Sequence, residues 1–225
     1  MIRLKGVTKY YPTKSGRNYI LKNVSFDMPS KCNIAILGRN GAGKSTLMRM
    51  LGYIEFPNSG EILSDYTFSW PLGLGGGFVG NMTGKANVKF VCRLYGKSKD
   101  EIKAIASYVK EFSELGKYFD MPIRTYSSGM RGRLSFGLSL AFDFDYMLID
   151  ETLSVGDTRF KKKSKEALMK KIEQSSVLLV SHDVKTVKEI CDSGIILDQG
   201  KLNFHEDVSE AIEAYETINK QPASK

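Results

Sequence analysis

Residues 38–46 combine glycines, a lysine and two hydroxyl side chains at the spacing of a phosphate-binding loop, directly after the apolar run of residues 34–37. They are Gly38, Arg39, Asn40, Gly41, Ala42, Gly43, Lys44, Ser45 and Thr46. The glycines let successive backbone N–H groups curl around phosphates, and a helix beginning near Lys44 adds partial positive charge there. In such a loop the lysine reaches the β- and γ-phosphates and the serine ligates Mg²⁺. We therefore predict that residues 38–46 bind a nucleoside triphosphate.

Asp150 and Glu151 follow an apolar run, residues 146–149, that is typical of a buried strand. At this position Asp150 can hold magnesium through water, and Glu151 can polarise the water that attacks the γ-phosphate. His182 ends the next such run, where its imidazole can stabilise transferred charge or orient Glu151 and the water. A lone histidine at a strand end is more often structural, but this sequence context favours catalysis. We therefore expect hydrolysis as well as binding.

An α/β fold is predicted to hold these residues, because short apolar runs alternate with helical stretches. Candidate strands are residues 2–7, 21–28, 33–37, 146–150, 177–180 and 194–197. The last three are nearly all apolar and are separated by helices, which indicates a parallel sheet buried on both faces. Between Gly84 and Arg124 apolar residues recur at three- and four-residue steps, as in an amphipathic helix, and we predict a helical insert.

The length of 225 residues fits one α/β domain with a sizeable core. The apolar runs are too short to cross a bilayer, and the N-terminal sequence lacks the apolar region of a signal peptide, so we expect a cytoplasmic protein. Three widely separated cysteines favour reduced thiols over disulfides or a zinc site.

The net charge of +8 points to an anionic partner, which charge alone does not identify: a nucleotide, a nucleic acid or the negative inner leaflet of a membrane. The densest basic run, residues 159–171, is predicted to be helical. Its lysines fit a solvated helix face, and they also fit a face turned toward a membrane or a partner.

Five elements stand in the order and spacing of an ATP-binding-cassette (ABC) ATPase, and the chain resembles that family. They are the phosphate loop and residues 126–130, 146–151, 154–157 and 177–183. One phosphate loop alone is a weak signal, whereas five ordered elements are specific. The resemblance implies ATP and Mg²⁺ as ligands, with Ser45 and Asp150 on the metal. It also implies a single domain over residues 1–225, with a mostly parallel core sheet, an antiparallel β subdomain and a helical signature subdomain inserted at about residues 84–142.

By the same resemblance, two copies of the domain pack head to tail as a homodimer. Ser127 and Gly129 of one copy then complete the ATP site of the other, and Asp157 helps to join the two sites. An apolar stretch follows Gly129, so this signature loop is expected at a helix N-terminus with donors available to a phosphate. Tyr11 matches the aromatic residue that stacks on adenine in the family. Tyr10 is the alternative, and both also fit ordinary tyrosines on a strand face.

The chain departs from the family pattern in the segment from Lys44 to Tyr126, because this segment contains no glutamine. ABC ATPases usually place there a glutamine that senses the γ-phosphate and couples to the transporter. Residues 69–78 stand in its place, with the only tryptophan of the chain and four glycines within five positions. They fit a plain surface loop, or a specialised coupling or substrate-proximal loop in which glycines permit close backbone approach.

Within the ABC proteins, the chain resembles the ATPase subunits of capsular polysaccharide exporters of Gram-negative bacteria. The likeness rests on the phosphate loop and on residues 69–78, 115–123 and 126–131. It implies a peripheral subunit on the cytoplasmic face of the inner membrane, paired with an integral membrane permease and a lipid-linked polysaccharide, and no nucleic acid. ATPases of other exporters, for O-antigen, teichoic acid or drugs, share the chemistry. A non-transport ABC protein that acts on ribosomes or DNA could use the positive charge, but such proteins usually carry tandem cassettes or long coiled-coil insertions, of which this sequence shows no sign.

Overall fold

The structure is a computed structural model that describes residues 1–72, 78–150 and 157–220. The chain forms two compact units. The first consists of Met1–Pro71, Phe144–Glu151 and Gln174–Lys225, and the second of Leu72–Asp143 and Thr152–Glu173. The helical insert expected at about residues 84–142 lies within the second unit, which also contains the basic run of residues 159–171.

A five-stranded sheet forms the centre of the first unit, in the order β5-β6-β3-β7-β8. Its strands are β3 (Ile34–Leu37), β5 (Tyr146–Asp150), β6 (Ser176–Val180), β7 (Ser193–Asp198) and β8 (Lys201–His205). The first four are parallel, and β8 pairs with β7 in the antiparallel sense. Nearly every residue of the four parallel strands is buried, which confirms the parallel sheet predicted from their apolar sequences.

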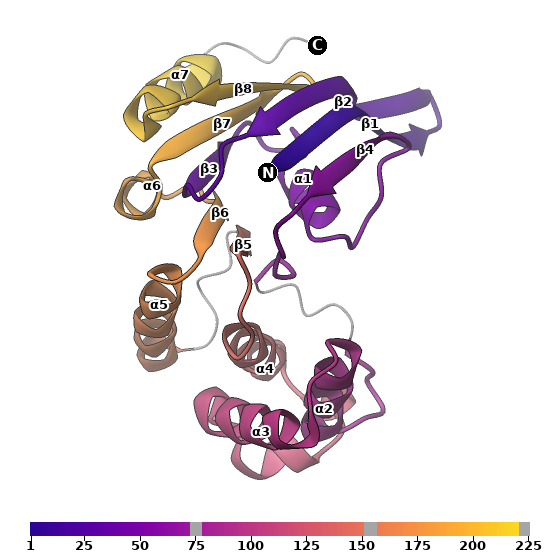
Figure 1. Cartoon of the computed structure of the whole chain (residues 1–225), viewed down its shortest axis with the longest axis vertical. Coiled ribbons are helices and arrows are strands. Elements are labelled where there is room, and N and C mark those ends of the chain that lie inside the picture. Colours follow the sequence, from indigo (N-terminus) through magenta and orange to yellow (C-terminus); the bar gives the residue numbers. More distant parts are fainter. Residues whose placement is uncertain (73–77, 151–156, 221–225) are drawn as a thin grey trace. The chain divides into compact units, whose positions relative to one another are not determined.

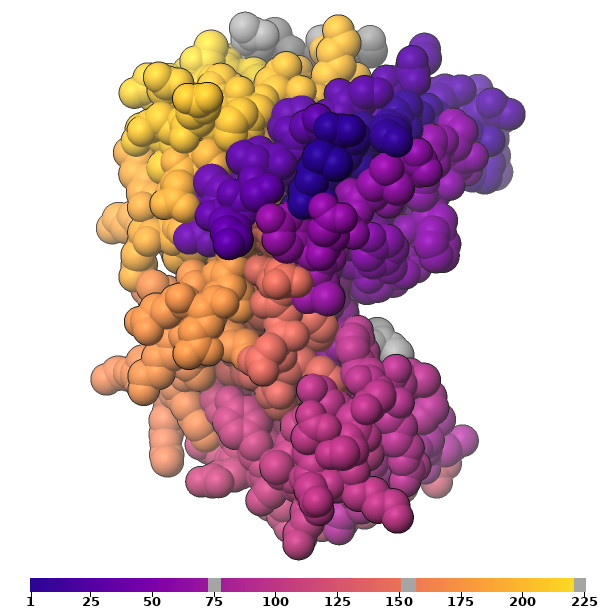
Figure 2. Space-filling view, viewed as in Figure 1, coloured from indigo at the N-terminus to yellow at the C-terminus, as the bar shows by residue number. Residues whose placement is uncertain are grey.

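A second, antiparallel sheet has the order β2-β1-β4 and is formed by β1 (Ile2–Thr13), β2 (Gly16–Met28) and β4 (Ser59–Ser64). The sequence-based strand list was wrong in omitting β4 and β8 and in starting the second strand at residue 21. These segments are largely exposed or half-buried, so they lack the apolar pattern that marks a buried strand. Figure 2 shows β1 and β2, in indigo, at the surface of this unit.

Helix α1 (Lys44–Leu51) packs between the two sheets, because buried residues of both sheets and of α1 form one apolar cluster. Helices α6 (Val184–Ile190) and α7 (Val208–Lys220) lie against the other face of the five-stranded sheet (Figure 1). The approach of α7 is close: a Cβ atom at Gly194 of β7 would stand 2.4 Å from the Cβ atom of Ala211. The sheet is thus covered on both faces, and its carboxyl edge is where the loops gather.

The second unit is helical, with α2 (Gly84–Leu94), α3 (Lys99–Ser113), α4 (Ser128–Leu140) and α5 (Thr158–Ile172). Two short 3₁₀ helices, η1 (Gly116–Asp120) and η2 (Ile123–Thr125), precede α4. Phe112 of α3 contacts both Phe136 of α4 and Phe160 of α5, with ring centroids 6.1 and 5.6 Å apart. These rings join three helices in one core, so the amphipathic pattern and the basic run both form helices as predicted. None of the helices in the described ranges combines the length and apolar character that a membrane crossing requires.

Candidate nucleotide-binding site

The carboxyl edge of the parallel sheet brings three predicted site elements together. Strand β6 lies between β3 and β5, and all three run in the same direction. The phosphate loop follows β3, His182 follows β6, and Asp150 is the last residue of β5, in register with Val180. Parallel strands end at the same edge, so Lys44, Asp150 and His182 lie at one edge of the sheet although the sequence separates them widely.

Gly43 is required where the phosphate loop turns into α1. It caps the helix in a left-handed conformation, with φ of 104°. A Cβ atom at this position would also stand 2.1 Å from the Cγ2 atom of Ile20 in β2. Both the backbone and the space around it therefore favour glycine. Ile20 was missed by sequence reasoning, because no motif connects it to the loop.

Lys44 is buried, with 8% of its surface exposed, and its ammonium is held by the loop itself. The Nζ atom donates to the carbonyl oxygens of Gly38 at 2.7 Å and Arg39 at 3.2 Å. Arg39 in turn donates to the carbonyl oxygen of Ile218 in α7. The phosphate-loop lysine is thus held in place before any phosphate arrives.

A pocket of about 410 Å³ opens beside Lys44. It is lined by Ile20, Asn40, Gly41, Gly43, Lys44, Ser45 and Thr46. The first turn of α1 contains no acidic residue, and no side chain caps its N-terminus. Its backbone N–H groups and partial positive charge therefore face this pocket without a competing carboxylate, which is the arrangement that binds phosphate.

Of the two candidate adenine-stacking tyrosines, Tyr11 lies beside the phosphate-loop helix. Its hydroxyl is 3.4 Å from the Oγ1 atom of Thr46 in α1 and donates to Glu55 at 2.7 Å. Tyr10 instead packs against Tyr19, with ring centroids 5.5 Å apart, and under the guanidinium of Arg17. Neighbouring residues of a strand point to opposite faces, so Tyr11 faces α1 whereas Tyr10 faces away from it.

Glu55 fixes the Tyr11 hydroxyl within a network that sequence reasoning missed. It accepts hydrogen bonds from Lys9 at 2.8 Å and from Arg49 at 3.1 Å, as well as from Tyr11. Partial burial acts to raise the pKa of Glu55, but the hydrogen bonds from Lys9, Tyr11 and Arg49 outweigh it and lower the pKa to about 2. The one sequence signal was Lys9, which follows Ile2, Leu4 and Val7 in the row of residues that the first strand buries.

The signature loop belongs to the second unit and begins α4. Ser127 caps the helix by accepting a hydrogen bond from the N–H of Met130 at 3.2 Å. Tyr126 is buried, and its hydroxyl donates to the carbonyl oxygen of Tyr118 at 2.6 Å, which anchors the loop. A Cβ atom at Gly129 would meet only the Oγ atom of Ser127, at 3.9 Å. The fold of the described chain therefore does not itself require glycine at position 129.

Comparison with known proteins decides the family. The ABC transporter family matches residues 21–154. The polysialic acid transport ATP-binding protein KpsT of Escherichia coli is 53% identical over 216 residues, 96% of this chain and 98% of its own length. The chain belongs to the ABC transporter ATP-binding proteins of capsule polysaccharide export. It is an ATPase of this family, which confirms the resemblance drawn from its motifs.

Two further known proteins are similar to this ABC ATPase, one in sequence and one in fold. The capsule polysaccharide export ATP-binding protein CtrD of Neisseria meningitidis serogroup B is 44% identical over 218 residues, 97% of this chain and all of its own length. The solved dimeric structure of MJ0796, a bacterial ABC transporter cassette, matches with a TM-score of 0.72 at 24% identity. That match covers 92% of this chain and 99% of the cassette. It confirms the predicted ABC fold.

Asp157 of the ABC ATPase joins two helices of the second unit. Its Oδ1 atom accepts from the N–H of Phe160 and caps α5, while its Oδ2 atom accepts from Arg133 of α4 at 2.7 Å. The Phe160 N–H, and then Arg133, hold the pKa of the Asp157 carboxyl below its usual value. Arg133 also lies 4.5 Å from the ring centroid of Phe160. Sequence reasoning missed Arg133, which ties the signature helix to the start of α5.

The basic run of the ABC ATPase is partly engaged within its own unit. Lys163 donates to Glu114 at 2.8 Å, and Lys171 pairs with Asp143. Lys163 and Lys171 thus make ion pairs within the second unit, and a face turned toward a membrane or a partner stays a prediction. Several predicted elements lie outside the described residues: the proposed base Glu151, residues 154–156 and the glycines of residues 73–77.

Proposed function

We propose that this ATPase powers export of a capsular polysaccharide through a separate integral membrane permease, at the cytoplasmic face of the inner membrane. The observation that carries the proposal is similarity over nearly the full length to KpsT and CtrD, which are described as proteins of polysialic acid transport and of capsule polysaccharide export. The lipid-linked polymer is the substrate of the whole complex, and the ATPase supplies the energy.

In this proposal the phosphates of ATP lie over the N-terminus of α1, where Lys44 contacts the β- and γ-phosphates. Tyr11 supplies the ring that stacks on adenine. The residues present also fit Mg²⁺: the Ser45 hydroxyl lines the pocket, and the Asp150 carboxylate ends a strand at the same sheet edge. Both offer the oxygen ligands that this ion prefers. When bound, the ion neutralises charge on the phosphates.

Hydrolysis requires a base and a group that orients the water. We assign Glu151 as the base, because it directly follows Asp150 in the sequence, and His182 as the residue that orients the water or contacts the γ-phosphate. The side chain of His182 is exposed and lies two residues after the end of β6, at the carboxyl end of the parallel strands.

A second copy of the chain completes the site in this proposal. Ser127 is exposed at the N-terminus of α4, and Gly129 lacks a side chain although its own fold leaves room for one. Close approach by a partner's nucleotide accounts for both features. Asp157, at the N-terminus of α5, would link the two composite sites across the homodimer.

Complementation of an encapsulated bacterium tests the proposal. A strain that lacks its own capsule-export ATP-binding protein retains polymer inside the cell; expression of this chain should restore surface polysaccharide, whereas its Lys44→Ala variant should not. Failure of the wild-type chain to restore export, when it is produced and hydrolyses ATP, would contradict the proposal. The substrate would then be that of another exporter, such as O-antigen, teichoic acid or a drug. Measuring which of these compounds stimulates ATP hydrolysis in the presence of the cognate permease would identify it.

A further inference from the structure

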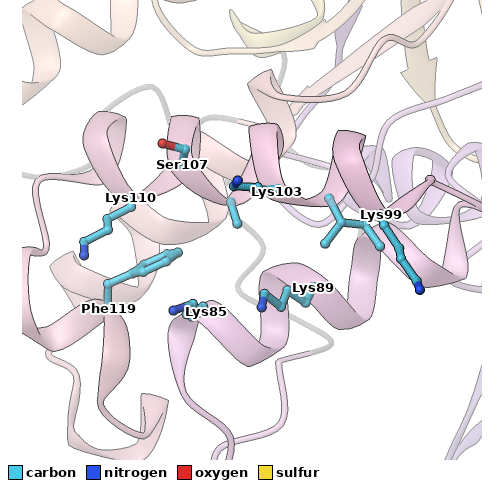
Figure 3. Close-up of a pocket in the computed structure, with 9 residues that line it drawn as sticks. Lys85, Lys89, Lys99, Lys103, Ser107, Lys110 and Phe119 are labelled. Atoms are coloured by element: carbon cyan, nitrogen blue, oxygen red, sulfur yellow. The ribbon is translucent and has the colours of Figure 1, made fainter.

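A groove between α2 and α3 of the second unit is lined by lysines on both walls. It has a volume of about 510 Å³. Lys85 and Lys89 come from α2, and Lys99, Lys103 and Lys110 come from α3 (Figure 3). These five residues define what we call the lysine groove. None of them belongs to the motifs that assign the ATP site.

Positive charge in the lysine groove is largely uncompensated. Asp120 pairs with Lys85 at 3.6 Å and with Lys110 at 3.8 Å, and all three side chains are about half exposed, so these pairs are weak. Lys89, Lys99 and Lys103 have no ion-pair partner in the described part of the chain. The groove therefore carries an excess of cations that an acidic ligand would balance.

The spacing of the lysines fits an elongated ligand with repeated negative charges. Lys85 and Lys89 are one turn apart on α2, as are Lys99 and Lys103 on α3, and Lys110 lies two turns further along. With a rise of 1.5 Å per residue, the row from Lys99 to Lys110 is about 16 Å long. A single phosphate or lipid headgroup would occupy only one end of it.

The floor of the groove suits sugar rings and does not suit nucleic-acid bases. Between the lysines lie Ile102 and Ala106, and the lysine stems add further apolar surface, against which the C–H faces of sugar rings can pack. Phe119 also lines the groove but is only 1% exposed, so it offers no ring on which a nucleic-acid base could stack.

We infer that the lysine groove binds an acidic stretch of the exported polysaccharide. This inference rests on the proposed function and deepens it, because it assigns a polymer with repeated carboxylates as the substrate and gives the ATPase a contact with it. The polymer would lie along the groove with its carboxylates against Lys89 and Lys103 at the centre and Lys85, Lys99 and Lys110 toward the ends.

Binding of fluorescent oligomers of sialic acid and of hyaluronan to the purified full-length protein tests the inference. Replacing the central pair, Lys89→Gln with Lys103→Gln, should weaken binding of the recognised oligomer at least about tenfold, since each lysine near an anionic partner contributes a severalfold effect. The charge-conserving pair Lys89→Arg with Lys103→Arg should retain the affinity. A matched control, Lys161→Gln with Lys201→Gln, removes the same charge from exposed positions outside the groove and should bind nearly as the wild type does.

Three results would overturn the inference. One is that neither acidic oligomer binds the wild-type protein more tightly than a neutral dextran of equal length. Another is that the Lys89 and Lys103 glutamine variant binds the oligomers as the wild type does. The third is that this variant loses binding only to phosphatidylglycerol vesicles, which would make the groove a membrane contact. In each case, restored capsule export by the wild-type chain would leave the proposed function standing, because complementation is scored separately.

Discussion

In the proposed mechanism, Lys44 and Glu151 have different roles at the same phosphate, and substitution should separate them. Lys44→Ala removes a buried cation that two loop carbonyls hold in place, so we expect ATPase activity to fall by about 10²-fold or more. Glu151→Gln removes the base and leaves the phosphate contacts, so ATP should still bind and hold two copies together. Steady-state ATPase assays with light scattering in the presence of ATP measure both effects. Full hydrolysis by Glu151→Gln would remove Glu151 as the base.

A separate prediction concerns Glu55 and the pH dependence of the free energy of unfolding. Its pKa is lowered from 4.5 to about 2 in the folded protein, so its ionised form stabilises the fold above pH 4.5, and that contribution is lost as the pH falls through 2. Glu55→Gln should therefore lower the free energy of unfolding at neutral pH by roughly 2 kcal/mol. Urea unfolding should show this difference narrowing as the pH falls below 4.5.

Glu61→Gln is the matched control for Glu55. Its side chain is more than half exposed and pairs with Lys5 at 3.3 Å, so the free energy of unfolding should change by less than about 1 kcal/mol. If both glutamine variants unfold alike at every pH, the Lys9, Tyr11 and Arg49 hydrogen bonds to Glu55 do not stabilise the fold as the structure indicates.

At the scale of elements, the segment that replaces the coupling glutamine starts from a fixed point. The Oγ atom of Ser69 accepts a hydrogen bond from the N–H of Leu148 in β5 at 2.8 Å. The ring of Trp70 packs against that of Phe144, with ring centroids 5.5 Å apart. This start of residues 69–78 is thus tied to the strand that ends in Asp150.

Substituting Gly75 and Gly76 with valine should separate transport from hydrolysis. ATPase activity of the isolated subunit should stay within a few-fold of wild type, about 1 kcal/mol in barrier height, because no phosphate-contacting residue changes. Surface polysaccharide should be lost while polymer accumulates inside the cell. Equal loss of ATPase activity and export would instead make the loop part of the catalytic site, and normal export would make it a tolerant surface loop.

The elements that sequence patterns predicted are those with strong local signals. The parallel strands are continuous apolar runs, and the phosphate loop is a contiguous motif, so both could be found by inspection. Strands β4 and β8 could not, because exposed edge segments lack that apolar pattern. The contacts of Lys9 and Tyr11 with Glu55 were missed for a different reason: each joins residues that lie far apart in the chain, so no local pattern indicates it.

At the scale of the whole molecule, our proposal gives each chain two halves of an ATP site. The phosphate loop belongs to the first compact unit, and Ser127 and Gly129 belong to the second. In the proposed homodimer the two halves belong to different composite sites, so every functional site needs two copies. Concentration-dependent ATPase activity is the expected consequence.

Mixing two inactive variants tests this central claim most directly. Lys44→Ala disables the phosphate loop, and Gly129→Asp places a carboxylate where the partner's phosphates approach, so each homodimer should be inactive. A heterodimer of the two variants combines one intact phosphate loop with one intact signature loop in a single site. We predict that single-turnover ATP hydrolysis, absent from each preparation alone, appears on mixing them. If the mixture stays as inactive as its components while heterodimers form, or if Gly129→Asp alone retains full activity, the composite site does not exist.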